Sequence, residues 1–70
     1  MGNRIDRMKK ERNELKDKCE DLSKFIHLNP TFKTLVHDEQ VRLIKQLGFM
    51  QAYLDVLDLR LFFANELVLS

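Results

Sequence analysis

Residues 43–64 read LIKQLGFMQAYLDVLDLRLFFA, and this stretch carries two apolar stripes where a helical hairpin needs only one. The first stripe recurs at the alternating four- and three-residue steps of a heptad pattern, through Leu43, Leu47, Met50, Leu54, Leu57, Leu61, Ala64 and Val68. The second has the same rhythm through Phe49, Ala52, Val56, Leu59 and Phe63. One stripe can pack on the first half of the chain, which leaves the other uncovered. Because an exposed apolar stripe of this length usually marks a protein–protein interface, we expect a homo-oligomer.

The first half of the chain predicts one long helix over residues 3–27. Glycine and proline are absent between Asn3 and Asn29, and the positions between the apolar residues are mostly charged. A heptad-like seam runs along this helix and includes one arginine, through Ile5, Met8, Arg12, Leu15, Cys19, Leu22 and Ile26. This seam is the natural partner for the first stripe of the second half.

The dipeptide Asn29-Pro30 ends this helix. The residue before a proline avoids helical geometry, and the proline itself has no amide N–H to donate. Pro30 can open a short helical turn that is capped by Asn29. We expect Phe32 and Leu35 to pack under this bend, which covers residues 28–37.

Residues 38–67 predict a second long helix, and Gln40 in its first turn can reach back to cap the helix start. An antiparallel hairpin aligns the two long helices in one register, in which the numbers of facing residues sum to 69. The facing pairs are Ile26 with Leu43, Leu22 with Leu47, Cys19 with Met50, Leu15 with Leu54, Arg12 with Leu57, and Met8 with Leu61. We therefore expect an all-α fold, with residues 1–70 forming a single hairpin domain.

The second stripe and its aromatic neighbours form the expected oligomer interface, which comprises Phe49, Ala52, Tyr53, Val56, Leu59, Phe62 and Phe63. The simplest assembly is a two-fold dimer in which the second helices pair to give a four-helix bundle, with a larger ring or cage as the alternative. The end of the chain is also apolar, and we expect it to dock on a neighbouring subunit through Phe62, Phe63, Leu67, Val68 and Leu69.

Length and composition exclude several classes of protein. A chain of 70 residues holds one domain at most, and its single cysteine, Cys19, rules out an internal disulfide framework. The spacing of Cys19, His27 and His37 matches no common zinc site, so we expect no metal and no cofactor. The sequence shows neither a membrane span nor a signal peptide, which favours a cytoplasmic protein. A net charge of +1 and interleaved acids disfavour nucleic-acid binding.

Basic residues of the first helix are candidates for an anion-binding site, namely Arg4, Arg7, Lys9, Arg12 and Lys16. Arg12 allows two interpretations, because it occupies a seam position. It is either an anion ligand or, as we favour, the partner of Asp58 in an ion pair between the helices. Cys19 is best interpreted as a small buried apolar residue, since no activating cation lies near it in the seam.

The pattern from Leu15 to Arg60 resembles one that recurs among small bacteriophage proteins of unassigned role. The resemblance is carried by Phe25-Ile26, Pro30, Phe32, Leu35, Glu39-Gln40, Leu43-Ile44, Gln46-Leu47, Met50, Tyr53-Leu54, Leu57 and Arg60. It implies a small helical protein made in the cytoplasm of an infected host.

The sequence contains no recognisable catalytic set, so we expect a protein that is not an enzyme. Our first hypothesis is an oligomeric interaction protein that binds and modulates a host protein, such as a defence factor. The alternative is an oligomer that sequesters a small anionic signal such as a cyclic nucleotide, held by the basic residues and by aromatic side chains that stack on the base. Nucleic-acid binding by the basic first helix ranks third.

Overall fold

The computed structural model describes the backbone of residues 3–69 and the side chains of residues 3–64. It contains α1 (Arg4–Leu28), α2 (Thr31–Thr34) and α3 (His37–Leu69), and no strand occurs in the range described. The expected all-α class is therefore confirmed. The long helices lie close to the ranges predicted from the sequence, which were 3–27 and 38–67.

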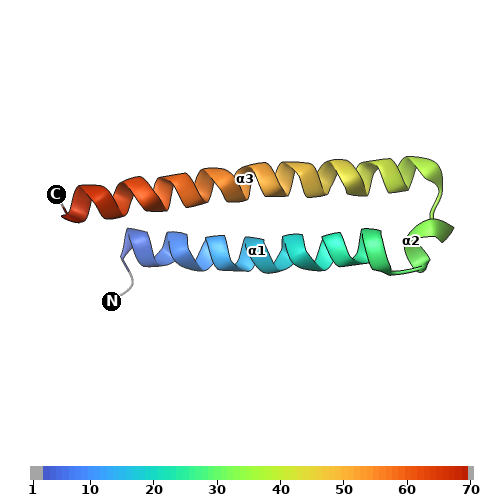
Figure 1. Cartoon of the computed structure of the whole chain (residues 1–70), viewed down its shortest axis with the longest axis horizontal. Coiled ribbons are helices and arrows are strands. Elements are labelled where there is room, and N and C mark those ends of the chain that lie inside the picture. Colours follow the sequence, from blue (N-terminus) through green and yellow to red (C-terminus); the bar gives the residue numbers. More distant parts are fainter. Residues whose placement is uncertain (1–2, 70) are drawn as a thin grey trace.

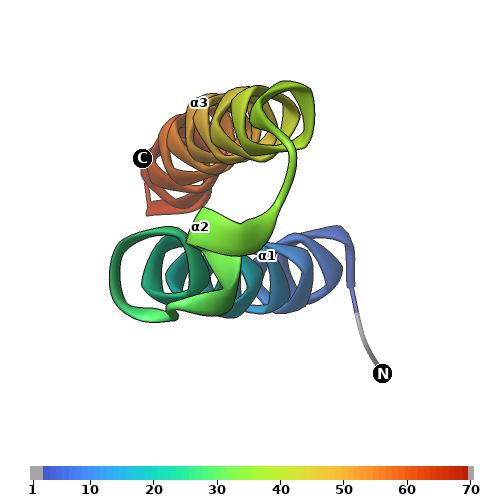
Figure 2. The same cartoon turned by 90° about the vertical axis from the view of Figure 1, so that its right-hand side faces the viewer.

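The two long helices lie side by side and run in opposite directions, with α2 at the turn between them (Figures 1 and 2). The pair is elongated, with principal dimensions of 51 × 20 × 15 Å. The first residues of α1 and the last turns of α3 therefore lie at the same end of the molecule (Figure 1). Residues far apart in the sequence meet there.

An asparagine caps the start of α1. Asn3 has extended backbone angles, and its Oδ1 accepts a hydrogen bond from the Asp6 amide at 2.8 Å. This bond satisfies one of the amide groups that have no partner inside the helix. The Asp6 carboxylate also lies in the first turn, where it opposes the positive end of the helix dipole.

The turn between the long helices is built as the sequence predicts. The Asn29 side chain accepts a hydrogen bond from the Thr31 amide at 2.9 Å, directly before α2, although the N-cap position itself belongs to Pro30. Phe32 is buried, with its ring edge-to-face against Phe25 at a centroid distance of 6.1 Å. Gln40 does reach back, but its Nε2 donates to the Leu35 carbonyl at 2.9 Å. It does so because that carbonyl lies before α3 and lacks a helical donor.

The core is a single row of side chains between α1 and α3. Every residue of the α1 seam, and of the first α3 stripe from Leu43 to Ala64, is buried or half-buried. The most protected side chain is Leu57, which is 0% exposed. A core of one row has room for only one of the two α3 stripes.

Candidate interaction surface and apolar groove

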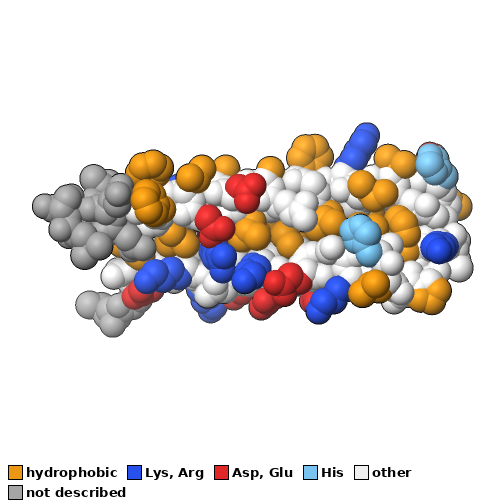
Figure 3. Space-filling view, in the orientation of Figure 1, with side chains coloured by type: hydrophobic (Ala, Val, Ile, Leu, Met, Phe, Trp, Pro, Cys, Tyr) orange, Lys and Arg blue, Asp and Glu red, His pale blue; other side chains and the backbone are white. Residues whose placement is uncertain are grey.

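The second apolar stripe of α3 is exposed in the single chain. We call it the outer stripe, and it comprises Phe49, Ala52, Val56, Leu59 and Phe63. Leu59 follows the buried Leu57 by two positions, which is about 200° around a helix, so the two side chains point to different sides of α3. Leu59 is 57% exposed and Phe49 is 76% exposed. Figure 3 shows hydrophobic side chains gathered along the α3 side of the molecule.

Two further residues of the predicted interface border the outer stripe. Phe62 is exposed and packs edge-to-face on Phe63, with ring centroids 5.5 Å apart. Tyr53 is 43% exposed, and its hydroxyl donates a hydrogen bond to the Glu11 carboxylate of α1. That hydrogen bond, with some help from burial, raises the pKa of Tyr53 above its ordinary value. Tyr53 therefore joins the two helices as well as bordering the stripe.

The apolar end of the chain, which was expected to dock on a neighbouring subunit, is described only in part. Phe62 and Phe63 are placed, whereas the side chains of Leu67, Val68 and Leu69 lie outside the described residues. The expectation that this segment docks on a neighbouring subunit stays a prediction.

A groove lies between the start of α1 and the second half of α3, with a volume of about 690 Å³. Ile5 and Met8 form one wall, and Val56, Phe63 and other apolar residues of α3 form the opposite wall. Two arginines line it as well, one from each helix, Arg4 and Arg60. Sites for small molecules usually measure about 300–1,000 Å³ and combine apolar walls with a few polar groups. The groove fits this description.

Neither Arg4 nor Arg60 forms an ion pair with any residue in the described range. Arg60 was not among the candidate anion-binding residues. A signal for it was present in the sequence, because the antiparallel register places residue 60 opposite residue 9, about one and a half turns from Arg4.

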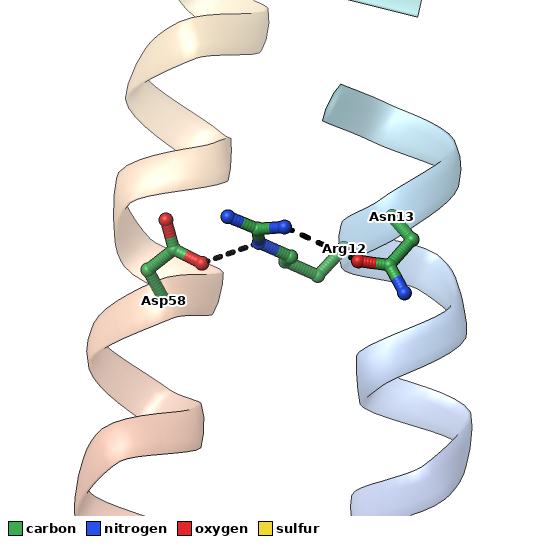
Figure 4. A network of polar contacts seen from close by, with 3 residues as sticks. All are labelled: Arg12, Asn13 and Asp58. Atoms are coloured by element: carbon green, nitrogen blue, oxygen red, sulfur yellow. Dashed lines mark hydrogen bonds and ion pairs between the residues drawn. The ribbon is translucent and has the colours of Figure 1, made fainter. Parts of the chain in front are cut away.

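Arg12 is engaged within the chain. Its Nε donates to the Asp58 carboxylate at 2.6 Å, and its Nη1 donates to Asn13 Oδ1 at 3.2 Å (Figure 4). The hydrogen bond to Asp58 raises the pKa of Arg12. Of the two interpretations of Arg12, the ion pair with Asp58 is therefore the one that the structure confirms.

The five basic candidates do not converge on one site. Arg7 and Lys9 are two positions apart, so they point about 200° away from each other on the helix. Arg4 lines the groove, whereas Lys16 lies near Cys19 and Gln51 on another part of the surface. The structure thus separates the predicted basic edge into parts, and only Arg4 among the five belongs to the groove.

Cys19 is a free, buried thiol in the seam between the helices. Burial raises its pKa, and the charge of Glu20 adds to the effect. This agrees with its interpretation as a small apolar core residue. Among the described residues, no three His, Cys, Asp or Glu side chains gather in a way that suits a metal ion. Within the same residues, no helix is both long enough and apolar enough to cross a bilayer.

Comparison with known proteins gives one family. The model of the Sequestin family matches residues 3–63, which is most of the chain. The chain belongs to the Sequestin family. No curated protein and no solved structure gives a significant match. The range matched to Sequestin includes α1, α2, the first stripe up to Leu61 and the whole outer stripe of α3.

Proposed function

We propose that this Sequestin-family chain is a non-enzymatic binding protein that sequesters a small anionic ligand and works as a homo-oligomer. The family's name suggests that its members sequester a partner. The observation that carries the proposal is the groove, where apolar walls from both long helices meet Arg4 and Arg60, which form no ion pair among the side chains that the structure describes.

The chemistry of the groove favours a ligand that combines negative charge with a flat aromatic group. Guanidinium groups bind phosphates through paired, charge-assisted hydrogen bonds. The apolar walls of the groove suit a flat nucleobase, because small-molecule sites are lined mostly by apolar side chains with a few polar groups that fix orientation. A cyclic nucleotide carries both features. We therefore rank sequestration of such a signal above the binding of a host protein, which the sequence alone had favoured.

Self-association is the second part of the proposal. A chain of this length seldom gains more than a few kcal/mol from its own core, and oligomerisation is a common source of additional stability. The outer stripe supplies an apolar surface for it, because five side chains spaced like a heptad seam are exposed on one face of α3. We propose that this stripe packs against the same stripe of a second copy.

Calorimetric titration with cyclic di- and trinucleotides tests the ligand. We expect binding by the native chain and its loss in the double variant Arg4→Gln, Arg60→Gln. The matched control is Lys33→Gln, which removes an exposed cation at the turn, far from the groove. If no nucleotide gives heat or protects the protein against melting, the proposal of a nucleotide ligand is wrong.

The exposed aromatic residues of the outer stripe favour a second candidate, which is a protein that binds a host factor during bacteriophage infection, in the host cytoplasm. Phe49 is among the most exposed large hydrophobic side chains of the described range, and aromatic residues are enriched at protein interfaces. Affinity capture from host lysate with the native chain and with Phe49→Glu tests this candidate. A host protein retained by the native chain and lost from the variant, with no nucleotide bound, would place this candidate first.

A further inference from the structure

We infer that two copies of α3 pair in parallel through the outer stripe, with equal residues of the two copies side by side. In this pair, Asp55 of each copy binds Arg60 of the other. This inference rests on the proposed homo-oligomer, and it adds the orientation of the subunits. It starts from the heptad positions of the outer stripe. Phe49, Val56 and Phe63 occupy position a, and Ala52 and Leu59 occupy position d.

The charged residues that border the stripe decide between the two possible orientations. Asp55 occupies position g and Arg60 occupies position e of the following heptad. Both are exposed, and neither forms an ion pair in the part of the chain that the structure describes. Residues at e and g form the ion pairs between coiled-coil helices that set partner choice and orientation.

A parallel pair satisfies both charges. In parallel coiled coils, position g of one helix faces position e of the next heptad of its partner, so Asp55 meets Arg60 of the second copy twice by symmetry. An antiparallel pair brings g against g instead, which places Asp55 next to Asp55 of the second copy and repels it. Charge complementarity therefore selects the parallel arrangement.

This arrangement differs from a compact four-helix bundle. The outer stripe lies on a different side of α3 from the core stripe, because Leu59 is about 200° from Leu57 around the helix. In its second half the outer stripe also borders the groove, through Val56, Leu59 and Phe63. A second copy on the outer stripe therefore packs along α3 beside the groove, and the contact between the copies uses a different side of α3 from the core of each hairpin.

The pairing also bears on the groove. Arg60 borders both the outer stripe and the groove, and its guanidinium has five N–H donors. It can therefore donate to Asp55 of the second copy and keep donors for an anionic ligand. In the dimer, the second copy closes the side of each groove where Val56 and Phe63 reach the surface.

Disulfide trapping tests the orientation. The variant Phe49→Cys, in a Cys19→Ala background, should form a covalent dimer on mild oxidation, because residue 49 faces residue 49 in a parallel pair. In an antiparallel pair centred on Val56, the two residues would be about 21 Å apart and would not cross-link. The matched control is Leu28→Cys, an exposed position on α1 that should stay monomeric on the gel. A native dimer without a residue 49 cross-link would overturn the inference.

A second measurement keeps Phe49 in place. Sedimentation equilibrium should show that Asp55→Asn weakens the dimer by roughly 2- to 30-fold, because two symmetric surface ion pairs are lost. The control is Asp21→Asn, which removes an exposed acid from α1. A tighter dimer in Asp55→Asn would indicate the antiparallel pair, and an unchanged dimer would mean that Asp55 makes no ion pair between the copies, so either result would overturn the inference. A native chain that stays monomeric would overturn the proposed oligomer as well.

Discussion

Arg12 Nε lies 2.6 Å from Asp58 Oδ1, which joins the middle of α1 to α3 across 46 positions of sequence. The pair lies at the surface, with the side chain of Arg12 28% exposed and that of Asp58 46% exposed. Such pairs contribute little to stability and are screened by salt. The pair instead favours one register of the two helices, because the charged Arg12 in an otherwise apolar seam gains a partner only where α3 places Asp58 beside it.

Asp58→Asn should lower the melting temperature slightly at low ionic strength. The difference from the native chain should shrink in 1 M NaCl, because salt screens the ion pair that the variant has lost. Melting curves followed by circular dichroism at both salt concentrations check this. Asp17→Asn, at an exposed site on α1, is the control. A loss as large at high salt as at low salt would mean that packing, rather than charge, is what Asp58 supplies.

Leu57→Ala should destabilise the fold by about 2–5 kcal/mol, because it removes a fully buried side chain and leaves a cavity in a one-row core. Urea denaturation measures the change. Ile44→Ala, on the same helix but 52% exposed, is the matched control and should change the free energy of unfolding by about 0.5 kcal/mol or less. Equal losses in the two variants would contradict the assignment of the core stripe.

Tyr53 should titrate above the ordinary tyrosine pKa of about 10, because Glu11 accepts a hydrogen bond from its protonated form. It is the only tyrosine and the chain has no tryptophan, so tyrosinate absorbance near 295 nm reports this group alone. Glu11→Gln should shift the midpoint back toward the ordinary pKa. A midpoint that does not move would show that the hydrogen bond is absent in solution.

The same shift predicts a loss of stability in alkali. The folded chain holds the Tyr53 proton more tightly than the unfolded chain does. The contribution of the protonated Tyr53 to the free energy of unfolding is therefore complete below about pH 10. It is lost as the pH rises through the raised pKa of Tyr53. Tyr53→Phe should remove this part of the pH dependence of unfolding.

Cys19 should react slowly with a thiol reagent at pH 8 in the folded protein. Burial keeps the reagent out and raises the pKa of Cys19, which lowers the amount of reactive thiolate. The rate should rise roughly tenfold or more in denaturant, as the opening of the helix pair exposes the thiol. Absorbance of the released chromophore follows the reaction. Equal rates in the folded and unfolded chains would contradict the burial of Cys19.

Val56→Glu should convert the native oligomer to a monomer, because it places a charge in the middle of the outer stripe. Native mass spectrometry measures the subunit number. Ile44→Glu is the matched control, since Ile44 is similarly exposed on α3 but lies outside the stripe. The idea that the outer stripe is an interface between copies fails if Val56→Glu leaves the subunit number unchanged.

Local features of the fold could be predicted from single residues. Asn29 and Pro30 determine where α1 ends. Asn29 avoids helical geometry because it precedes a proline, and Pro30 has no amide N–H to donate. Phe32 under the turn followed from its place in that short segment. The cap at Asn3 is as local as these, because its signal is an asparagine directly before a helical pattern.

The candidate site was predicted only in part. Arg4 was named from its charge, whereas Arg60 was missed because it stands alone among apolar residues on the other helix. Lys9 and Lys16 were predicted on one edge of the helix, with Arg4 one or two turns earlier, although the five positions from Arg4 to Lys9 turn their side chains about 140° apart. The outer stripe, in contrast, could be recognised from its spacing.

By itself, the sequence determined which residues of α3 share a face, because a fixed rotation per residue converts spacing into direction. The tertiary structure decided which groups from different helices meet, namely Arg12 with Asp58, Tyr53 with Glu11, and Arg4 with Arg60 at the groove. These contacts depend on how far each side chain reaches across the gap between α1 and α3. That reach depends on how the two helices are rotated and shifted relative to each other. The pattern of one helix gives directions around its own axis only, so it does not include this placement.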